Sequence, residues 1–122
     1  MKVTYSKACK LSVILGKCAI KQLGGELFIP VIKAKAKLTA IEKEHAELEQ
    51  SVLKELGFEA GQPVSMDDYN KIAKEQKKLS EQEVEVEGID LLNEINFKSL
   101  SDENPKLTTD ELEIIMELMV KE

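Results

Sequence analysis

The stretch Leu27–Gly57, LFIPVIKAKAKLTAIEKEHAELEQSVLKELG, decides the fold. Apolar residues recur along it at spacings of three and four, so that one face of a helix is apolar over most of its length. Pro30 fits the first turn of a helix, and Gly57 is typical of the residue that follows a helix end. The stretch therefore predicts one long helix that ends near Leu56. The stripe consists of Val31, Ala34, Leu38, Ile41, His45, Leu48, Val52 and Leu56.

The spacing of this stripe is heptad-like through Val52, which is typical of a helix that packs against another helix. Three heptads leave open whether the partner helix belongs to the same chain or to a second copy. We expect a homo-oligomer, and we take five stripe positions as candidate self-association residues: Val31, Leu38, Ile41, Leu48 and Val52.

A second helix is predicted from about Ser6 to Leu23, before a turn at Gly24-Gly25. At about 100° per residue, four of its lysines fall within an arc of about 80°. Such a stripe is most simply a solvated face, and the alternative is a basic surface for an anionic partner. His45 is similarly open to two interpretations: a packed, hydrogen-bonded residue, or a ligand-contacting or pH-sensitive group. The candidate ligand-binding residues are Lys7, Lys10, Lys17, Lys21 and His45.

Two more helices are indicated by their N-terminal caps. Ser65 followed by Asp68 predicts a third helix, and Thr108 followed by Glu111 predicts a last helix that runs to about Val120. This last helix has Met116 and Met119 in its apolar stripe, which favours gap-filling core residues, or an adaptable binding surface if they are exposed.

Strict alternation over Glu83–Glu87 predicts a half-buried strand. The following segment, Ile89–Phe97, is too short to classify. It either completes a small β-hairpin over residues 83–97 or forms a helical turn that covers the core. Met1–Tyr5 is a short lead-in with some strand character. The expected fold is mainly α, a single helical domain over residues 1–122, in which a long central helix is packed by three shorter helices.

The charge is divided unevenly along the chain. Residues 1–40 have a net charge of +7 and residues 41–122 a net charge of −13, and the chain as a whole has −6. All basic residues are Lys, which disfavours sites built on bidentate guanidinium contacts to phosphate. The two blocks could dock on each other within one chain or between copies, and any anionic partner should meet residues 1–40.

Several function classes find no support. The longest apolar stretch, Leu11–Ile20, is shorter than the roughly 20 residues of a membrane span. It is also a poor match to a signal peptide, because Lys17 interrupts its apolar region. We therefore expect a cytoplasmic protein that does not associate with a membrane. One His and two cysteines, Cys9 and Cys18, cannot supply a usual zinc site, and we expect buried, reduced thiols. Phosphate-loop, dinucleotide and nucleophile-elbow motifs are absent from the sequence, so we expect no enzyme, no metal and no cofactor.

The order of segments resembles a group of small, largely uncharacterised helical proteins encoded by tailed bacteriophages or prophages. The resemblance spans nearly the whole chain, although each segment is generic. It implies a phage origin, and therefore the cytoplasm of a host cell, and it carries over no functional residue. The segments that carry it are Leu27–Val31, Leu53–Gly57, Tyr69–Leu79, Glu83–Val86 and Leu107–Leu112.

These observations favour a non-enzymatic accessory or assembly protein that self-associates through its helices and binds another protein. The alternative is an oligomeric sponge that binds an anionic nucleotide signal through the basic N-terminal helix. Nucleic acid is a poor candidate partner, because the chain is acidic and its lysine excess is confined to the first third.

Overall fold

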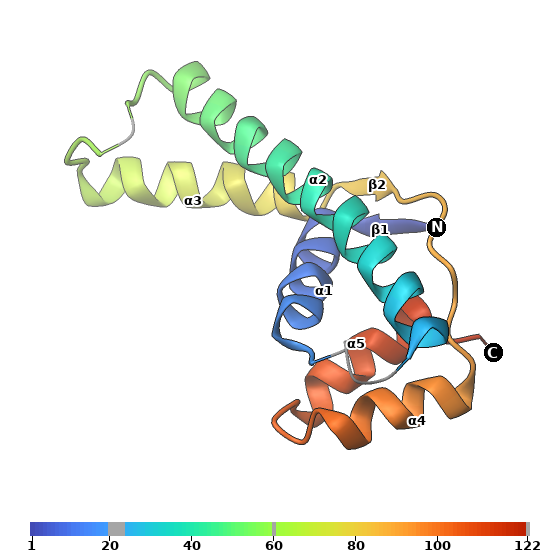
Figure 1. Ribbon diagram of the computed structural model, residues 1–122. Coiled ribbons are helices and arrows are strands. Elements are labelled where there is room, and N and C mark those ends of the chain that lie inside the picture. Colours follow the sequence, from blue (N-terminus) through green and yellow to red (C-terminus); the bar gives the residue numbers. More distant parts are fainter. Residues whose placement is uncertain (20–23, 60, 122) are drawn as a thin grey trace.

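The computed structural model describes residues 1–19, 24–59 and 61–121, and within these ranges the chain is mainly α-helical. Figure 1 shows a long helix packed against shorter helices, with one small antiparallel pair of strands. The predicted fold class is therefore confirmed. The elements are β1 (Lys2–Thr4), α1 (Tyr5–Lys17), α2 (Gly25–Glu55), α3 (Met66–Ser80), β2 (Glu83–Glu85), α4 (Glu94–Glu103) and α5 (Thr109–Met119).

The long helix α2 buries the first half of its predicted stripe. Val31, Ala34 and Leu38 have no exposed surface, and Ile41 is only 8% exposed. The helix ends at Glu55, and Gly57 follows with φ +83°, a conformation that glycine adopts without steric cost. Its start differs from the prediction: α2 begins at Gly25, so that Pro30 lies in the second turn.

Burial of the residues before Pro30 explains the earlier start of α2. The Leu27 side chain is buried and Phe28 packs against the core, while the Phe28 N–H already donates to the Gly24 carbonyl oxygen at 2.9 Å. Proline in this position loses the helical hydrogen bond to the Glu26 carbonyl, and its ring also crowds that carbonyl. Packing of the helix start therefore outweighs the preference of proline for the first turn.

Helix α1 covers the inner face of the first half of α2. Thr4 caps its first turn, because the Thr4 hydroxyl accepts the Lys7 N–H at 3.2 Å, and Ala8, Leu11 and Ser12 are completely buried. The helix ends at Lys17, earlier than the predicted Leu23, and Cys18 is already extended. Residues 20–23, which the prediction included, lie outside the described residues.

The second half of α2 and helix α3 form an antiparallel arm that stands away from the rest of the molecule (Figure 1). Ser65 caps α3 as predicted, since its hydroxyl accepts the Asp68 N–H at 3.2 Å. Leu48 and Val52 of α2 are partly buried and pack against the core cluster, whereas Leu79 of α3 is buried. The arm is therefore held mainly at its base.

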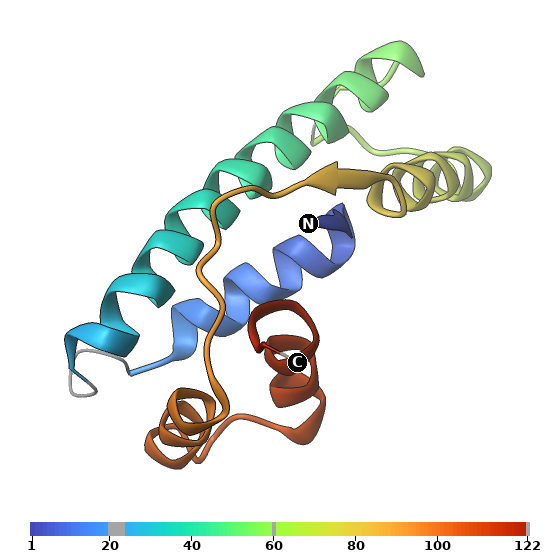
Figure 2. The same cartoon turned by 90° about the vertical axis from the view of Figure 1, so that its right-hand side faces the viewer.

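Strand β2 pairs with β1, in the register Val3 opposite Val84. The predicted hairpin partner, residues 89–97, is not its neighbour: this segment is an extended connection followed by α4. Asn93 starts α4, because its side-chain oxygen accepts the Asn96 N–H at 2.7 Å. The connection runs beside α2 (Figure 2), where the Lys37 ammonium donates to the Glu87 carbonyl oxygen at 2.6 Å. A local cap thus overrides the strand-like composition of this segment.

Helices α4 and α5 cover the end of the core farthest from the arm. The chain between them turns at Asn104, and the end of α5 is fixed to the connection before α4. There the Leu92 N–H donates to the Met119 carbonyl oxygen at 2.6 Å, and the Lys121 N–H donates to the Leu92 carbonyl oxygen at 2.9 Å. The two helices thereby form one unit with a shared surface.

Candidate functional site

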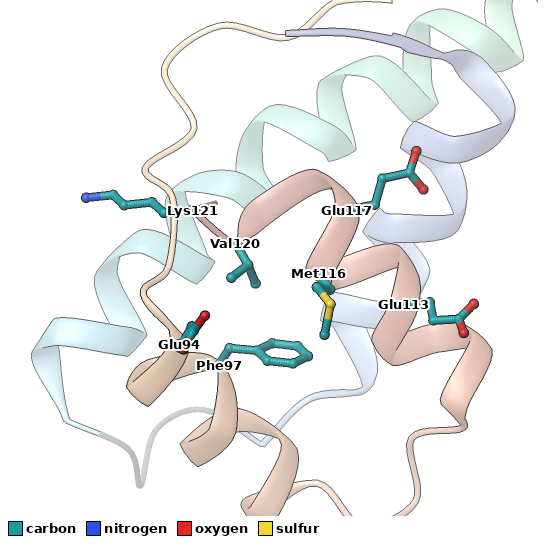
Figure 3. A pocket seen from close by; sticks show the side chains of 7 residues that line it. All are labelled: Glu94, Phe97, Glu113, Met116, Glu117, Val120 and Lys121. Atoms are coloured by element: carbon teal, nitrogen blue, oxygen red, sulfur yellow. The ribbon is translucent and has the colours of Figure 1, made fainter.

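A groove of about 610 Å³ lies between α4 and α5. Figure 3 shows the Phe97 ring of α4 and the Met116 side chain of α5 pointing toward each other, with Val120 beside them. The Met116 side chain is 52% exposed, while Phe97 and Val120 are partly buried. These three apolar side chains form the floor of the groove and leave apolar surface open to solvent.

Local sequence signals place these side chains on the groove. Thr108 and Glu111 form the predicted capping box, which fixes the start of α5. The inner face of α5 buries Ile115, Leu118 and Met119, so the neighbouring position Met116 faces outward, beside α4. The prediction of Met119 as a core residue is correct. Met116 is not a core residue: it forms the exposed surface that was the alternative interpretation of the methionine stripe.

The rim of the groove carries more acidic than basic groups. Its charged residues are Glu94, Glu113, Glu117 and Lys121. The Glu117 carboxylate already pairs with the Lys7 ammonium at 2.6 Å, so that Glu94 and Glu113 supply the negative charge that the groove presents to a ligand. In Figure 3 Glu113, Glu117 and Lys121 extend away from the apolar floor, which keeps the floor accessible. The groove is thus apolar at its centre and acidic at its edge.

The predicted lysine stripe faces α5 at two of its four positions. Lys7 pairs with Glu117, and Lys17 pairs with Glu111 at 3.1 Å. Lys10 is exposed, and Lys21 lies outside the described residues. The basic and acidic blocks of the chain therefore meet within one molecule, as one of the two expected arrangements requires. Each of these pairs is exposed on its lysine side, where screening by water and salt keeps its contribution to stability small.

His45 lies where α1, α2 and α3 meet. Its Nδ1 is 2.8 Å from the Glu49 carboxylate, its Nε2 is 3.2 Å from the Ser80 hydroxyl, and the Tyr5 ring centroid is 5.3 Å from its own. With 13% of its side chain exposed, His45 is packed and hydrogen-bonded. This is the first of its two predicted interpretations, and the lysine stripe does not share its surroundings.

Three polar side chains are arranged in space like a catalytic nucleophile, its base and the carboxylate that orients the base. They are Ser80, His45 and Glu49, in that order. Catalysis would also need N–H donors for an oxyanion beside Ser80. The next two N–H groups are engaged, because Glu81 donates to the Lys77 carbonyl and Gln82 to the Leu79 carbonyl. Ser80 is also the last residue of α3, where the helix dipole disfavours negative charge. The three residues therefore form a polar link that joins α3 to α2.

The candidate self-association residues are covered by this chain's own helices. Val31, Leu38 and Ile41 are buried in the core, where α1 packs against α2, and Leu48 and Val52 are partly buried. Val31, Leu38 and Ile41 are therefore not accessible to a second copy, whereas Leu48 and Val52 keep part of their surface, and self-association through the stripe stays a prediction. The spacing of the stripe could not show this, because it is the same for an internal and an external partner.

The two cysteines are free and only partly buried, so they are less enclosed than predicted. Burial raises the pKa of the Cys18 thiol to about 11, and the nearby charge of Glu111 adds to this shift. Burial also raises the pKa of the Cys9 thiol, with smaller contributions from Glu42 and Glu49. Both thiols therefore favour the protonated, unreactive form.

Comparison with known protein families, curated proteins and solved structures found no match. The resemblance to phage proteins therefore stays a prediction. Within the described ranges, none of the helices combines the length and the apolar character needed to cross a membrane. The same part of the chain contains no cluster of three or more His, Cys, Asp or Glu side chains that could hold a metal ion.

Proposed function

We propose that this chain is a non-enzymatic protein-binding protein, and that its α4–α5 groove receives the apolar face of a basic amphipathic helix of a partner. The observation that carries the proposal is the apolar floor of Phe97, Met116 and Val120 inside an acidic rim. An accessory or assembly role of the kind favoured by the sequence requires such a surface.

The size and chemistry of the groove suit a helical peptide. Its volume lies in the range of sites that hold several side chains, and it is open along one side rather than enclosed. Helix-in-groove recognition uses large apolar side chains at i, i+3, i+4 and i+7 as anchors. The flexible thioether of Met116 can adapt to anchors of different shape.

The charge of the rim selects the partner. Glu94 and Glu113 favour Lys or Arg on the flanks of the incoming helix, and they disfavour an acidic helix or a phosphate group. The nucleotide-sponge alternative has less support, because two of its lysines are paired with acids of α5 and His45 lies in a different place.

Fluorescence anisotropy with a designed peptide tests this proposal. The probe is an amphipathic helical peptide with Leu at i, i+3, i+4 and i+7 and Lys at the other positions. Its charge-reversed twin carries Glu instead of Lys. We expect the basic peptide to bind more tightly than the acidic one. Met116→Lys should weaken binding at least about tenfold. The matched control is Met66→Lys, which changes the charge equally at an exposed methionine of α3 and should leave binding nearly unchanged.

Methionine methyl resonances locate the bound peptide. The chain has four methionines, and only the Met116 side chain lines the groove. We expect the Met116 methyl signal to shift on titration with the basic peptide while the Met66 signal stays in place. Equal losses of affinity from Met116→Lys and Met66→Lys would show attraction by net charge alone and would contradict the proposal. A Met116 signal that shifts on dilution without peptide would instead identify a second copy as the occupant.

A further inference from the structure

A lysine of α1 lies at one edge of the α4–α5 groove. The Lys7 ammonium donates a hydrogen bond to the Glu117 carboxylate at 2.6 Å, although the two residues are 110 positions apart in the sequence. Lys7 is in the first turn of α1, where its N–H is held by the Thr4 cap. Glu117 is one of the residues that line the groove. The chain thus supplies a cation of its own to the acidic rim.

The edge of the groove along α5 consists of two carboxylates. Glu113 and Glu117 are four residues apart in α5, so their side chains leave the same face of the helix one turn apart. In Figure 3 both lie on the same side of Met116. Like charges at this spacing repel each other, and a cation beside them relieves the repulsion. This edge is therefore suited to hold a Lys or Arg side chain, and Lys7 is already there.

The Lys7 ammonium stands in for the cation of a partner. It is the same chemical group as a lysine of the basic helix proposed above, and it uses the same acceptor. Because Lys7 belongs to the same chain, it is always close to Glu117, whereas a partner must arrive from solution. With Lys7 included, the rim has three carboxylates and two ammonium groups, a net charge of −1. Without the Lys7 charge, the net charge of the rim would be −2.

We propose that Lys7 forms an autoinhibitory contact: its ion pair with Glu117 competes with the cations of a partner helix, so that the groove binds most tightly when Lys7 is displaced or neutralised. This inference rests on the proposed function and adds the regulation of the same site. The Lys7 and Glu117 side chains are 46% and 55% exposed, and an exposed ion pair is weak enough to be exchanged for another. The Lys17–Glu111 pair differs, because Glu111 is only 19% exposed and also accepts the Thr108 N–H.

Neutralising Lys7 tests the proposal with the basic peptide described above. Lys7→Gln removes the charge and keeps a polar side chain. In fluorescence anisotropy at low salt, Lys7→Gln should lower the Kd for the basic peptide at least about twofold, because one competing exposed ion pair is lost. This gain should shrink at high salt. The matched control is Lys71→Gln, which removes the same charge from an exposed lysine on the α2–α3 arm, away from the groove (Figure 1), and should leave the Kd nearly unchanged.

Two further variants separate competition at Glu117 from a simple change of net charge. Lys7→Arg keeps the charge and the ability to pair with Glu117, so it should not gain affinity for the basic peptide. In a Glu117→Gln background the carboxylate that Lys7 occupies is absent, so Lys7→Gln should gain less affinity there than it gains in the wild-type background. Circular dichroism confirms that each variant keeps its helices.

The outcomes distinguish this inference from the function on which it rests. The inference alone is wrong if the peptide binds and Met116→Lys weakens binding, but Lys7→Gln binds no more tightly than Lys71→Gln. It is equally wrong if Lys7→Gln gains the same affinity in the Glu117→Gln background. A peptide that binds neither the wild type nor Lys7→Gln would contradict both the proposed function and the inference. Binding to Lys7→Gln alone would support both and would show that the inhibition is nearly complete.

Discussion

Lys17 of α1 and Glu111 of α5 form an ion pair at 3.1 Å, and the same Glu111 side chain accepts the Thr108 N–H at 3.0 Å. One carboxylate thus caps the start of α5 and holds it against α1. The backbone hydrogen bond from Thr108, followed by the hydrogen bond and charge of Lys17, holds the pKa of Glu111 below its usual value.

We expect Glu111→Gln to lower the free energy of unfolding at pH 7. Because the folded-state pKa of Glu111 is the lower one, its contribution is complete above the unfolded-state pKa of about 4.3 and is lost as pH falls through the folded-state value. Urea denaturation of both proteins should therefore show a difference at pH 7 that closes below about pH 4. Glu55→Gln, at the exposed end of α2, is the control for removing one carboxylate. A difference that stays constant with pH would contradict this role.

Asn104 holds the loop between α4 and α5 to the end of α1. It is 8% exposed, its side-chain oxygen accepts the Ala19 N–H at 2.7 Å, and its side-chain nitrogen donates to the Leu100 carbonyl at 2.8 Å. Asn104→Ala should cost about 1–3 kcal/mol of stability, because both partners lose a hydrogen bond. Asn104→Asp keeps the acceptor for Ala19 but turns a carboxylate oxygen toward the Leu100 carbonyl in a buried place, so at pH 7 it should cost at least as much as Asn104→Ala. Asn70→Ala, on the exposed face of α3, should change stability by less than about 0.5 kcal/mol in the same thermal denaturation series.

Substitution of Leu38 tests whether the apolar stripe of α2 packs inside a single chain. Its side chain has no exposed surface, so Leu38→Ala should cost about 2–5 kcal/mol through lost burial and a cavity. Leu91→Ala, at a side chain that is 45% exposed, should cost far less. Chemical denaturation at several protein concentrations measures both. A loss for Leu38→Ala that depends on concentration would indicate that this face is shared with a second copy.

The features that local sequence determines were predictable. The caps at Ser65 and Thr108 form as expected, and the end of α2 lies within one residue of its prediction, because each depends on neighbours a few positions away. The strand at residues 83–87 was expected, but its pairing with residues 2–4 was not, since strand partners are chosen by tertiary packing.

The candidate site was only partly predictable. The methionine stripe of α5 indicated an adaptable surface as one alternative, whereas Phe97 gave no signal, because the groove exists only after α4 packs beside α5. The exposure of Ile29 and Ile32 on α2 was hidden for another reason. These isoleucines alternate in sequence with residues of the buried face, and periodicity alone favours the longer stripe.

Tyr5 should titrate at a higher pH than a free tyrosine. Burial raises the pKa of its hydroxyl, and the Glu44 carboxylate, 3.1 Å away, raises it further. In a Tyr69→Phe variant, absorbance at the phenolate band should therefore show a midpoint above pH 10, and adding Glu44→Gln should lower it. Because the folded-state pKa is the higher one, this contribution to stability is complete below about pH 10 and is lost as pH rises further. A midpoint at the free value in a protein that keeps its helices would contradict the buried placement.

The Cys18 thiol should react slowly. A pKa of about 11 leaves only about one thiolate per thousand molecules at pH 8. Iodoacetamide should therefore modify Cys18 in a Cys9→Ser variant about a hundredfold more slowly than it modifies a free cysteine. Reaction in urea, where the burial is removed, provides the control rate. Equal rates in the folded and unfolded protein would show that the thiol is freely accessible.

The pairing of β1 with β2 has a consequence for the order of folding. The α2–α3 arm is formed by residues that follow each other closely, whereas the ladder joins the first residues of the chain to a strand about two thirds of the way along it. Closing so long a loop has a larger entropic cost than closing the arm. Ribosomal synthesis also delivers β1 and α1 well before their strand partner. Strand β1 must therefore wait for β2, and we expect Lys2–Thr4 to become protected from hydrogen exchange later than the α2–α3 arm.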